Sequence, residues 1–186
     1  MSAAGPVKRR PEKSEHYLNR AEVVSEMSTC LRRRIGAIIV SNDGVELSSG
    51  YVGSPRGTAH CTDTGTCLRR DLKIPPGERY ELCRSVHAEQ NAIINAARTG
   101  VSLVDGEMFI SSERIREAYD SSRGENDRIY GPCMICKKQI INAGITRVHM
   151  REKGVGVRSY DVQELRELLA QEESEIGKSL RPGKSL

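Results

Sequence analysis

Apolar side chains recur at steps of three and four positions along the first part of the chain. They are Tyr17, Leu18, Ala21, Val24, Met27 and Leu31. This spacing is typical of one face of a helix, which we expect to begin near Ser14 and to pack on a sheet. A β-branched apolar run over 35–40, a turn signal over 42–44 and an alternating segment over 45–51 then predict a β-hairpin.

Helical and strand patterns alternate in the second half of the chain. A helix is expected from 87 to about 98, a strand over 107–111 and a second helix over 133–143. Another strand is expected over 145–150. Asp161 and Glu164 have the spacing of a capping box, which predicts a last helix over 161–173.

This order of helix, hairpin, helix, strand, helix and strand predicts a three-layer α/β domain with a mixed central sheet. At least one strand pair should be parallel and joined by a right-handed helical crossover. We expect the domain to span 14–176, with flexible ends over 1–13 and 177–186. The connection over 52–84 and a polar excursion over 112–131 lack periodicity, and so long a connection is usually functional or tied by a metal.

The composition describes an ordinary soluble protein of 186 residues, of which 37% are hydrophobic and 29% charged. Lys and Arg number 29 against 25 Asp and Glu, and the net charge of +4 favours anionic partners only weakly. The apolar runs are shorter than the roughly 18 residues of a membrane span, and the N-terminus has no apolar signal core. We therefore expect a cytoplasmic protein without membrane contact, whose six cysteines are metal ligands or core residues before they are disulfides.

Two cysteines three positions apart, Cys133 and Cys136, stand at the expected start of a helix. Their sulfur atoms should lie on one face, where free N–H groups and the helix dipole favour thiolates. The pair could be half of a metal site or, taken alone, a redox pair. His87 begins the other helix and offers a third ligand, although a lone histidine is more often a partly buried residue with satisfied hydrogen bonds.

Glu89 distinguishes a catalytic metal from a structural one. Three protein ligands that leave a fourth position to water are typical of catalytic zinc. A carboxylate two residues from His87, at the start of a helix, is placed to take protons from the activated water and to return them. His-x-Glu followed by Pro-Cys-x-x-Cys matches the signature of zinc-dependent deaminases.

Four stretches together resemble the deoxycytidylate deaminase branch of the cytidine deaminase superfamily. They are residues 30–40 (CLRRRIGAIIV), 50–57 (GYVGSPRG), 83–89 (CRSVHAE) and 132–136 (PCMIC). The resemblance covers most of the chain. It implies an α-β-α sandwich and the conversion of dCMP to dUMP and ammonia.

Carried over to this chain, the resemblance implies zinc on His87, Cys133 and Cys136, with Glu89 as the proton shuttle. The backbone amide of Ala88 would lie near the pyrimidine O2. Family members assemble as dimers or hexamers, so a homo-oligomer is also implied, and regulation by dCTP or dTTP is an open alternative.

Substrate contacts are expected at Tyr51, Ser54 and Arg56, and Arg34 joins Arg56 as a candidate partner of the phosphate. Val52 stands where family members usually have asparagine, and its side chain cannot make a hydrogen bond to the sugar. Beyond the strand at 150, Arg and Lys side chains replace a tyrosine that the family often places near the phosphate, which makes Arg151 a further candidate.

Three alternatives stay open. The substrate could be another cytosine nucleotide such as dCTP. A deaminase of tRNA or single-stranded nucleic acid would share the zinc residues, but the absence of Trp and the single Phe disfavour base stacking and hence a nucleic-acid partner. A non-catalytic zinc module would not need Glu89.

The remaining cysteines, Cys30, Cys61, Cys67 and Cys83, are predicted to bind a second, structural zinc. Four thiolates are a usual closed tetrahedral set, and some deoxycytidylate deaminases carry a second zinc at positions like Cys30 and Cys61. Such a site would order the connection over 52–84, although His60 could replace one thiolate. The alternative is that these are small buried residues.

Overall fold

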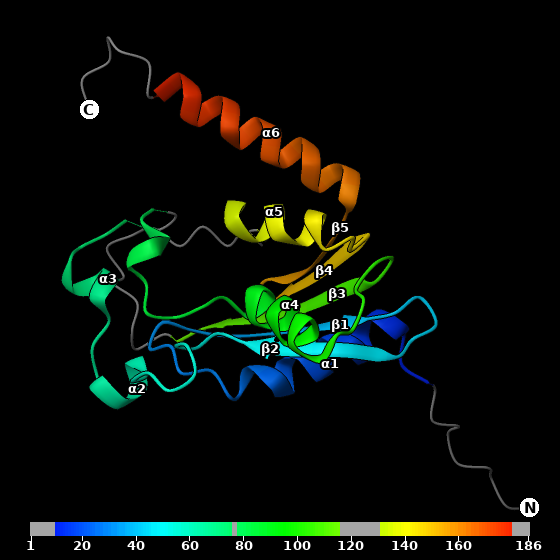
Figure 1. Cartoon of the computed structure of the whole chain (residues 1–186), viewed down its shortest axis with the longest axis horizontal. Coiled ribbons are helices and arrows are strands. Elements are labelled where there is room, and N and C mark those ends of the chain that lie inside the picture. The colour runs from blue at the N-terminus through cyan, green and yellow to red at the C-terminus, as the bar shows by residue number, and fades with distance from the viewer. Residues whose placement is uncertain (1–9, 76–77, 116–130, 180–186) are drawn as a thin grey trace, which may run out of the picture.

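The structure is a computed structural model that describes residues 10–75, 78–115 and 131–179 (Figure 1). Its centre is a five-stranded sheet in the order β2-β1-β3-β4-β5. The strands are β1 (Arg33–Val40), β2 (Glu46–Tyr51), β3 (Glu107–Arg114), β4 (Arg147–Glu152) and β5 (Gly156–Asp161). β3 and β4 are parallel and the other neighbouring pairs are antiparallel, so the predicted hairpin and mixed sheet are confirmed.

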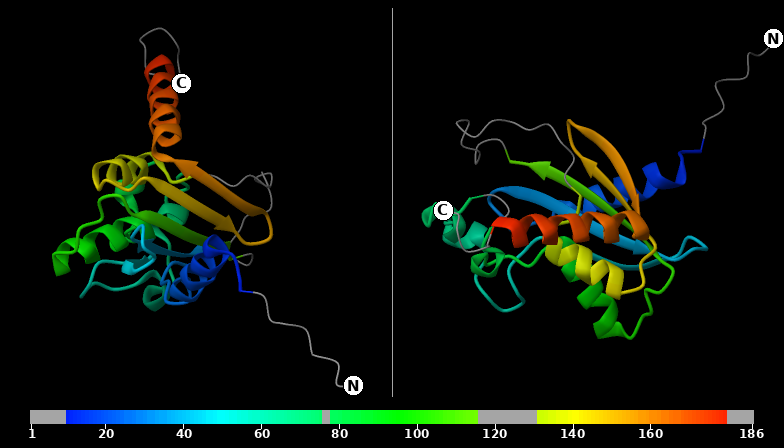
Figure 2. Two further views of the ribbon diagram at one scale, coloured as in Figure 1. Left: turned by 90° about the vertical axis from the view of Figure 1, so that its right-hand side faces the viewer. Right: turned by 90° about the horizontal axis from the view of Figure 1, so that it is seen from above.

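Helices cover both faces of the sheet (Figures 1 and 2). α1 (Lys13–Ser25) packs on β1 and β3 from one side. On the other side α4 (Ala88–Thr99) packs on β1 and β2, beside α5 (Met134–Asn142), and α6 (Val162–Ser179) lies on α5. This is the predicted three-layer α-β-α sandwich. Among the described helices, none combines the length and the apolarity that crossing a membrane requires.

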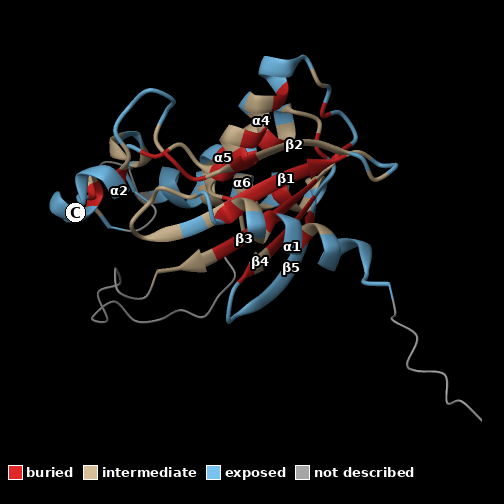
Figure 3. Cartoon of the chain, turned by 90° about the horizontal axis from the view of Figure 1, so that it is seen from below, coloured by how far each residue is buried: buried red, intermediate tan, exposed pale blue. Residues whose placement is uncertain are grey.

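Alternation along the strands divides the core between two faces of the sheet. Ile38, Val40 and Phe109 point to the α1 side, here called the outer face, where Leu18 and Ala21 of α1 cover them. The opposite, inner face packs on α4 and α5. Its strand residues are Ala37, Ile39, Met108, Ile110, Val148 and Met150. The buried residues accordingly follow the central strands (Figure 3).

Two glycines allow the helices to approach the sheet closely. A Cβ on Gly36 of β1 would lie 2.2 Å from the carbonyl oxygen of Ala21 in α1. A Cβ on Gly50 of β2 would lie 2.3 Å from the backbone nitrogen of Ala92 in α4. Each helix therefore meets strand backbone where a side chain would otherwise separate the two layers.

The first helix is shorter than predicted. α1 ends at Ser25, so Met27 and Leu31 lie in the following loop, and Met27 is exposed. The hydroxyl of Ser28 accepts a hydrogen bond from the N–H of Ile35 at 3.1 Å and donates one to its carbonyl at 3.2 Å. These two bonds hold the loop alongside β1, where the helix cannot continue.

The C-terminal elements also differ from prediction. β5 is an edge strand, and of its six described residues Tyr160 alone is buried, so the sequence shows almost no alternation there. α6 continues to Ser179, beyond the domain boundary expected at 176. Most of the excursion over 112–131 and of the predicted flexible ends lies outside the described residues.

The connection over 52–84 contains short elements that its aperiodic sequence does not indicate. They are α2 (Cys61–Thr64), α3 (Leu68–Asp71) and the 3-10 helix η1 (Tyr80–Leu82). All three lie at the end of the molecule opposite the β1–β2 turn (Figure 1).

Candidate active site

The three residues predicted to hold zinc lie together. Nδ1 of His87 is 3.4 Å from Sγ of Cys133 and 3.4 Å from Sγ of Cys136. All three ligand atoms lie within 4.8 Å of one another. Within the described part of the chain, no other group of three or more His, Cys, Asp or Glu residues has this geometry.

The starts of two helices position these ligands. His87 is the N-cap of α4, Cys133 is the N-cap of α5, and Cys136 lies in the first turn of α5. A bridge between Gly53 and Val86, with N–H to O=C bonds of 2.8 and 3.2 Å, fixes the backbone just before His87. The site is therefore supported by regular secondary structure on both sides.

The donor set fits a zinc ion. One imidazole and two thiolates form a known catalytic zinc set, and three protein ligands leave a fourth position for water. A hydrogen bond from Cys136 holds the pKa of the Cys133 thiol well below its usual value. The N-terminus of α5 favours the same thiolate.

Glu89 lies in the first turn of α4 and is 6% exposed. Burial raises the pKa of its carboxyl, and the negative charge of Cys133 raises it further. The positive charge of His87 acts in the other direction and lowers it. A raised pKa makes it easier for a carboxyl group to hold a proton between taking it up and releasing it, which general acid and base catalysis requires.

Three of the predicted substrate contacts lie in segments that adjoin His87 in the chain or in the structure. Ala88 is the buried first residue of α4, directly after His87. Ser54 follows Gly53 directly and Tyr51 precedes it by two residues, and Gly53 forms the bridge to Val86, the residue before His87. Ser54 Oγ is buried and has no hydrogen-bond partner among the described residues, so it can serve a ligand.

The arginines predicted to bind phosphate have other partners. Arg34 lies on the outer face, with Nη1 3.9 Å from Oε2 of Glu113. Arg56 is exposed and donates a hydrogen bond of 2.8 Å to an asparagine of α4. Arg151 also lies on the outer face, where it donates hydrogen bonds of 2.7 and 3.1 Å to side chains of α1.

Tyr80 and Arg69 contact the site although no sequence motif indicates them. The ring of Tyr80 meets the ring of His87 edge to face, with centroids 5.1 Å apart. The guanidinium of Arg69 lies 4.7 Å from the centre of the Tyr80 ring and donates to the carbonyls of Pro75 and Glu78 at 2.8 and 2.6 Å. The buried Arg69 thus ties the connection over 52–84 to the ligand His87.

Of the four cysteines predicted to bind a second zinc, Cys61 begins α2 and Cys67 is the N-cap of α3. Cys61 and Cys67 are buried, whereas Cys30 and Cys83 are half-buried. Burial raises the pKa of the Cys61 thiol, and negative charge on each of the other three raises it further. Among the described residues, however, no three of these four thiols lie within 4.8 Å of one another.

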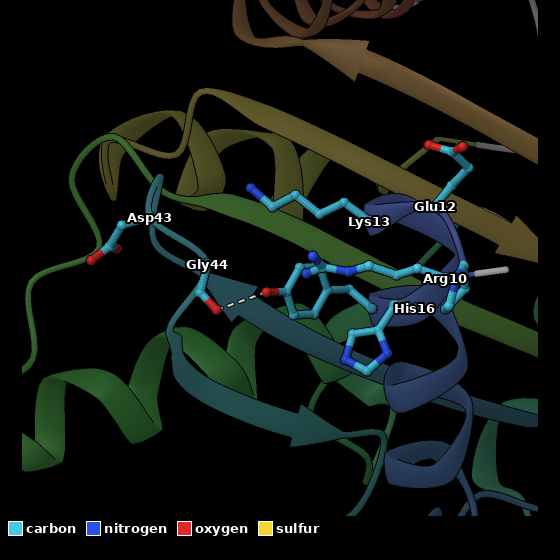
Figure 4. Close-up of a pocket in the computed structure, with 8 residues that line it drawn as sticks. Arg10, Glu12, Lys13, His16, Asp43 and Gly44 are labelled. Atoms are coloured by element: carbon cyan, nitrogen blue, oxygen red, sulfur yellow. Dashed lines mark hydrogen bonds between the residues drawn. The ribbon is translucent and has the colours of Figure 1, made fainter. Parts of the chain in front are cut away.

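A hollow of about 670 Å³ lies apart from these residues, between the start of α1 and the β1–β2 turn (Figure 4). Arg10, Lys13, His16 and Asp43 line it, and Tyr17 donates a hydrogen bond of 2.7 Å to the carbonyl of Gly44 across it. Because the turn is at the far end of β1 from the segment that leads to His87, the hollow is no part of the candidate site.

Two known deoxycytidylate deaminases match much of the chain in sequence. The one from Schizosaccharomyces pombe is 29% identical over 146 residues, which are 77% of this chain and 38% of that protein. The one from Mycobacterium phage D29 is 30% identical over 144 residues, which are 75% of this chain and 94% of that protein. The chain thus spans well under half of the fungal relative and nearly all of the phage relative.

A solved structure and a family model agree with these relatives. The dCMP deaminase of cyanophage S-TIM5, solved in complex with dCMP and dUMP, is 27% identical with a TM-score of 0.54, and the match covers 88% of this chain and 94% of that one. The model of the cytidine and deoxycytidylate deaminase zinc-binding region matches residues 11–152, a range that includes His87, Glu89 and both cysteines of the zinc-binding group. The chain belongs to the cytidine and deoxycytidylate deaminase family.

Proposed function

We propose that this chain is a zinc-dependent hydrolytic deaminase that converts dCMP and water to dUMP and ammonia. The observation that carries the proposal is the buried carboxyl of Glu89 beside the His87, Cys133 and Cys136 group, because a structural zinc needs no such acid. The relatives support dCMP as the substrate, since the phage D29 protein is a deoxycytidylate deaminase and the cyanophage enzyme binds dCMP and dUMP.

The roles of the residues follow from their positions. His87, Cys133 and Cys136 would hold a zinc ion, which would supply the nucleophile by lowering the pKa of a water molecule toward about 7. Glu89 takes a proton from that water as its oxygen bonds to C4, and delivers the proton to N3 of the cytosine. Glu89 then takes the proton of the new C4 hydroxyl and passes it to the amine, so that the C4–N bond breaks, C4=O forms and ammonia leaves. Ala88, as the first residue of α4, has a backbone N–H without an intrahelical acceptor, which is available to the pyrimidine O2.

A substrate panel tests this proposal. Ammonia release from cytidine, deoxycytidine, CMP, dCMP, dCTP and a tRNA hairpin should give the highest kcat/KM with dCMP. The unphosphorylated nucleosides should be poor substrates because they cannot use contacts to the phosphate. A preference for either nucleoside, or for the tRNA hairpin, would contradict the assignment, and a preference for dCTP would move it to the triphosphate.

The resemblance also implies a homo-oligomer and, in some members, regulation by dCTP or dTTP, and the sequence predicts a cytoplasmic location. These stay predictions. Val52 is buried beside the predicted sugar contacts and offers no hydrogen bond, so a regulatory nucleotide would have to be recognised through other side chains.

We further propose that Cys30, Cys61, Cys67 and Cys83 bind a second, structural zinc. The N–H of Arg32 donates to Sγ of Cys30 at 3.4 Å, and such backbone donors favour the thiolate form that binds metal. Burial raises the pKa of Cys83, while a hydrogen bond from the backbone of the residue two positions later opposes that rise. The thiols do not form a group of three within 4.8 Å, so the ion would draw them together.

Elemental analysis tests the second zinc. Purified protein should contain close to two zinc ions per chain, and Cys61→Ser or Cys67→Ser should lower the content to about one. The matched variant Cys136→Ser should lose the other zinc, together with activity. A wild-type content of one zinc that Cys61→Ser and Cys67→Ser leave unchanged would refute the second site.

A further inference from the structure

A buried lysine follows the zinc ligand Cys136 directly in the chain. Lys137 belongs to α5, and its side chain is only 5% exposed. Lysine is almost never buried to this extent unless its ammonium group is paired. Its partner is Glu172 of α6, whose Oε1 lies 2.5 Å from Nζ of Lys137. Because helical side chains tilt toward the start of their helix, this ion pair joins α6 to the end of α5 that carries the zinc ligands.

The same two helices also share the core on the inner face of the sheet. Leu165 of α6 is fully buried in one cluster with Cys136 and Ile140 of α5. α6 begins directly after β5 and runs along α5 (Figure 1). α5 is therefore held between the sheet and α6, and a shift of α6 would be transmitted to it.

The ion pair favours one alignment of α6 on α5. The hydrophobic contacts between the helices are non-directional. A slip along the helix axis, in contrast, would leave the ammonium group of Lys137 buried without a carboxylate, which is strongly unfavourable. The other carboxylate oxygen of Glu172, Oε2, is buried and has no hydrogen-bond partner among the described residues, so the pair satisfies the lysine more fully than the glutamate.

The metal ligands come from two helices, so their arrangement depends on how α5 lies relative to α4. His87 is the N-cap of α4, whereas Cys133 and Cys136 belong to the start of α5. A displacement of α5 would move both sulfur atoms relative to Nδ1 of His87, from which each is now 3.4 Å away. α6 lies wholly beyond residues 11–152, so this support comes from outside the zinc-binding region that the family model matches.

We propose that Lys137 and Glu172 are positioning residues, whose ion pair holds the start of α5 in place and thereby sets the arrangement of Cys133 and Cys136 around the metal. Both residues act through the cysteines and touch neither metal nor substrate. The inference rests on the proposed function, because it concerns the zinc ion of that reaction. Groups that orient metal ligands typically change metal affinity or activity about 10–100-fold when they are replaced.

Zinc affinity and steady-state kinetics of Lys137→Met and Glu172→Gln test the proposal. The affinity is measured by competition with a chelator, and the zinc that Cys136→Ser protein fails to bind is the ion at the candidate active site. Both variants should bind this zinc about 10-fold more weakly than wild type, and kcat for dCMP at saturating zinc should fall about 10-fold. KM for dCMP should stay within about twofold of wild type, as it does when the loss is confined to the transition state. Since the side chain of Glu172 is 40% exposed, its replacement should leave the fold intact.

Reversal of the two charges provides a rescue. Lys137→Glu places a carboxylate against Glu172 and should weaken zinc binding as well. The double variant Lys137→Glu with Glu172→Lys restores a pair of opposite charges, and it should bind zinc more tightly than Lys137→Glu alone. Loss of packing by itself would not be corrected in this way.

Lys138→Met is the matched control. Lys138 is the next residue of α5 and pairs with Glu173 of α6 at 3.0 Å, but the two side chains are 51% and 52% exposed. Exposed ion pairs contribute little, so zinc affinity and kcat should stay at the wild-type values.

Two results would overturn the proposal. One is wild-type zinc affinity and kcat in Glu172→Gln, even if the variant unfolds at a lower denaturant concentration, because the pair would then serve stability alone. The other is an equal loss in Lys138→Met. Wild-type protein that does not deaminate dCMP would refute the proposed function, whereas the zinc measurements would still decide the role of the ion pair.

Discussion

Replacing Glu89 with glutamine is expected to lower kcat for deamination about 10²–10⁴-fold or more, while the protein keeps its zinc and its fold. Glutamine has nearly the shape of glutamate and preserves the packing of the first turn of α4, where Glu89 is buried. It cannot, however, accept a proton from water or deliver one to the base, and a positioned general acid and base contributes about this factor.

Three measurements decide this prediction: ammonia release under saturating dCMP, zinc content and thermal unfolding. Glu107→Gln is a suitable control, because Glu107 is a half-buried glutamate that pairs with His149 at 3.0 Å and lies on β3 away from the zinc ligands. Its kcat should stay within about twofold of wild type. Turnover by Glu89→Gln at the wild-type rate, with zinc retained, would show that another residue moves the proton.

The ligand group could be predicted from sequence because local signals position each of its members. His87 and Cys133 stand where a helix starts, and Cys136 and Glu89 lie within the first turn of their helices. A short spacing within one turn determines which side chains share a face, whatever the rest of the chain does. The starts of α4 and α5 must also lie close together, and this follows because both helices pack on the same face of the sheet.

The arginines at the start of β1 show what a local pattern cannot reveal. The sequence indicates Arg34, Arg56 and Arg151 as phosphate partners, and these stay predictions. The structure places Arg33 on the inner face and its neighbour Arg34 on the outer one. Successive residues of a strand point to opposite faces, so one position changes the layer that a side chain enters. Only the register of β1 against β3 and β4, a long-range property, identifies Arg33, Arg114 and Glu152 as one cluster.

The loop contacts of the site were unpredictable for a different reason. Tyr80 and Arg69 belong to a segment without periodicity, and their contacts with each other and with His87 depend on how that segment folds back. β5 escaped prediction because an exposed edge strand needs no apolar alternation. The contacts of Tyr80 and Arg69 and the pairing of β5 with β4 both lack a local sequence pattern that would predict them.

Gly50→Ala is expected to destabilise the protein by about 1–3 kcal/mol and to reduce kcat about 10²-fold. The new Cβ would lie 2.3 Å from the nitrogen of Ala92 and 2.6 Å from the carbonyl oxygen of Ala88. Both are backbone atoms of α4, so no side-chain rotation relieves the clash, and the helix has to move away from β2. Because α4 carries Glu89 next to Ala88, the same displacement moves the acid, and an error of about 1 Å in placing a catalytic group can cost about 10²-fold in rate.

Gly177→Ala provides the matched control for this last prediction, because it adds the same methyl group in α6, where a Cβ meets no atom within 4 Å. There the substitution should leave kcat unchanged and raise stability by roughly 0.5–1 kcal/mol, since alanine favours a helix interior over glycine. Chemical denaturation together with steady-state kinetics on both variants separates the two effects. If Gly50→Ala unfolds at the wild-type denaturant concentration and turns over dCMP at the wild-type rate, then the close packing of α4 on β2 does not position the catalytic residues.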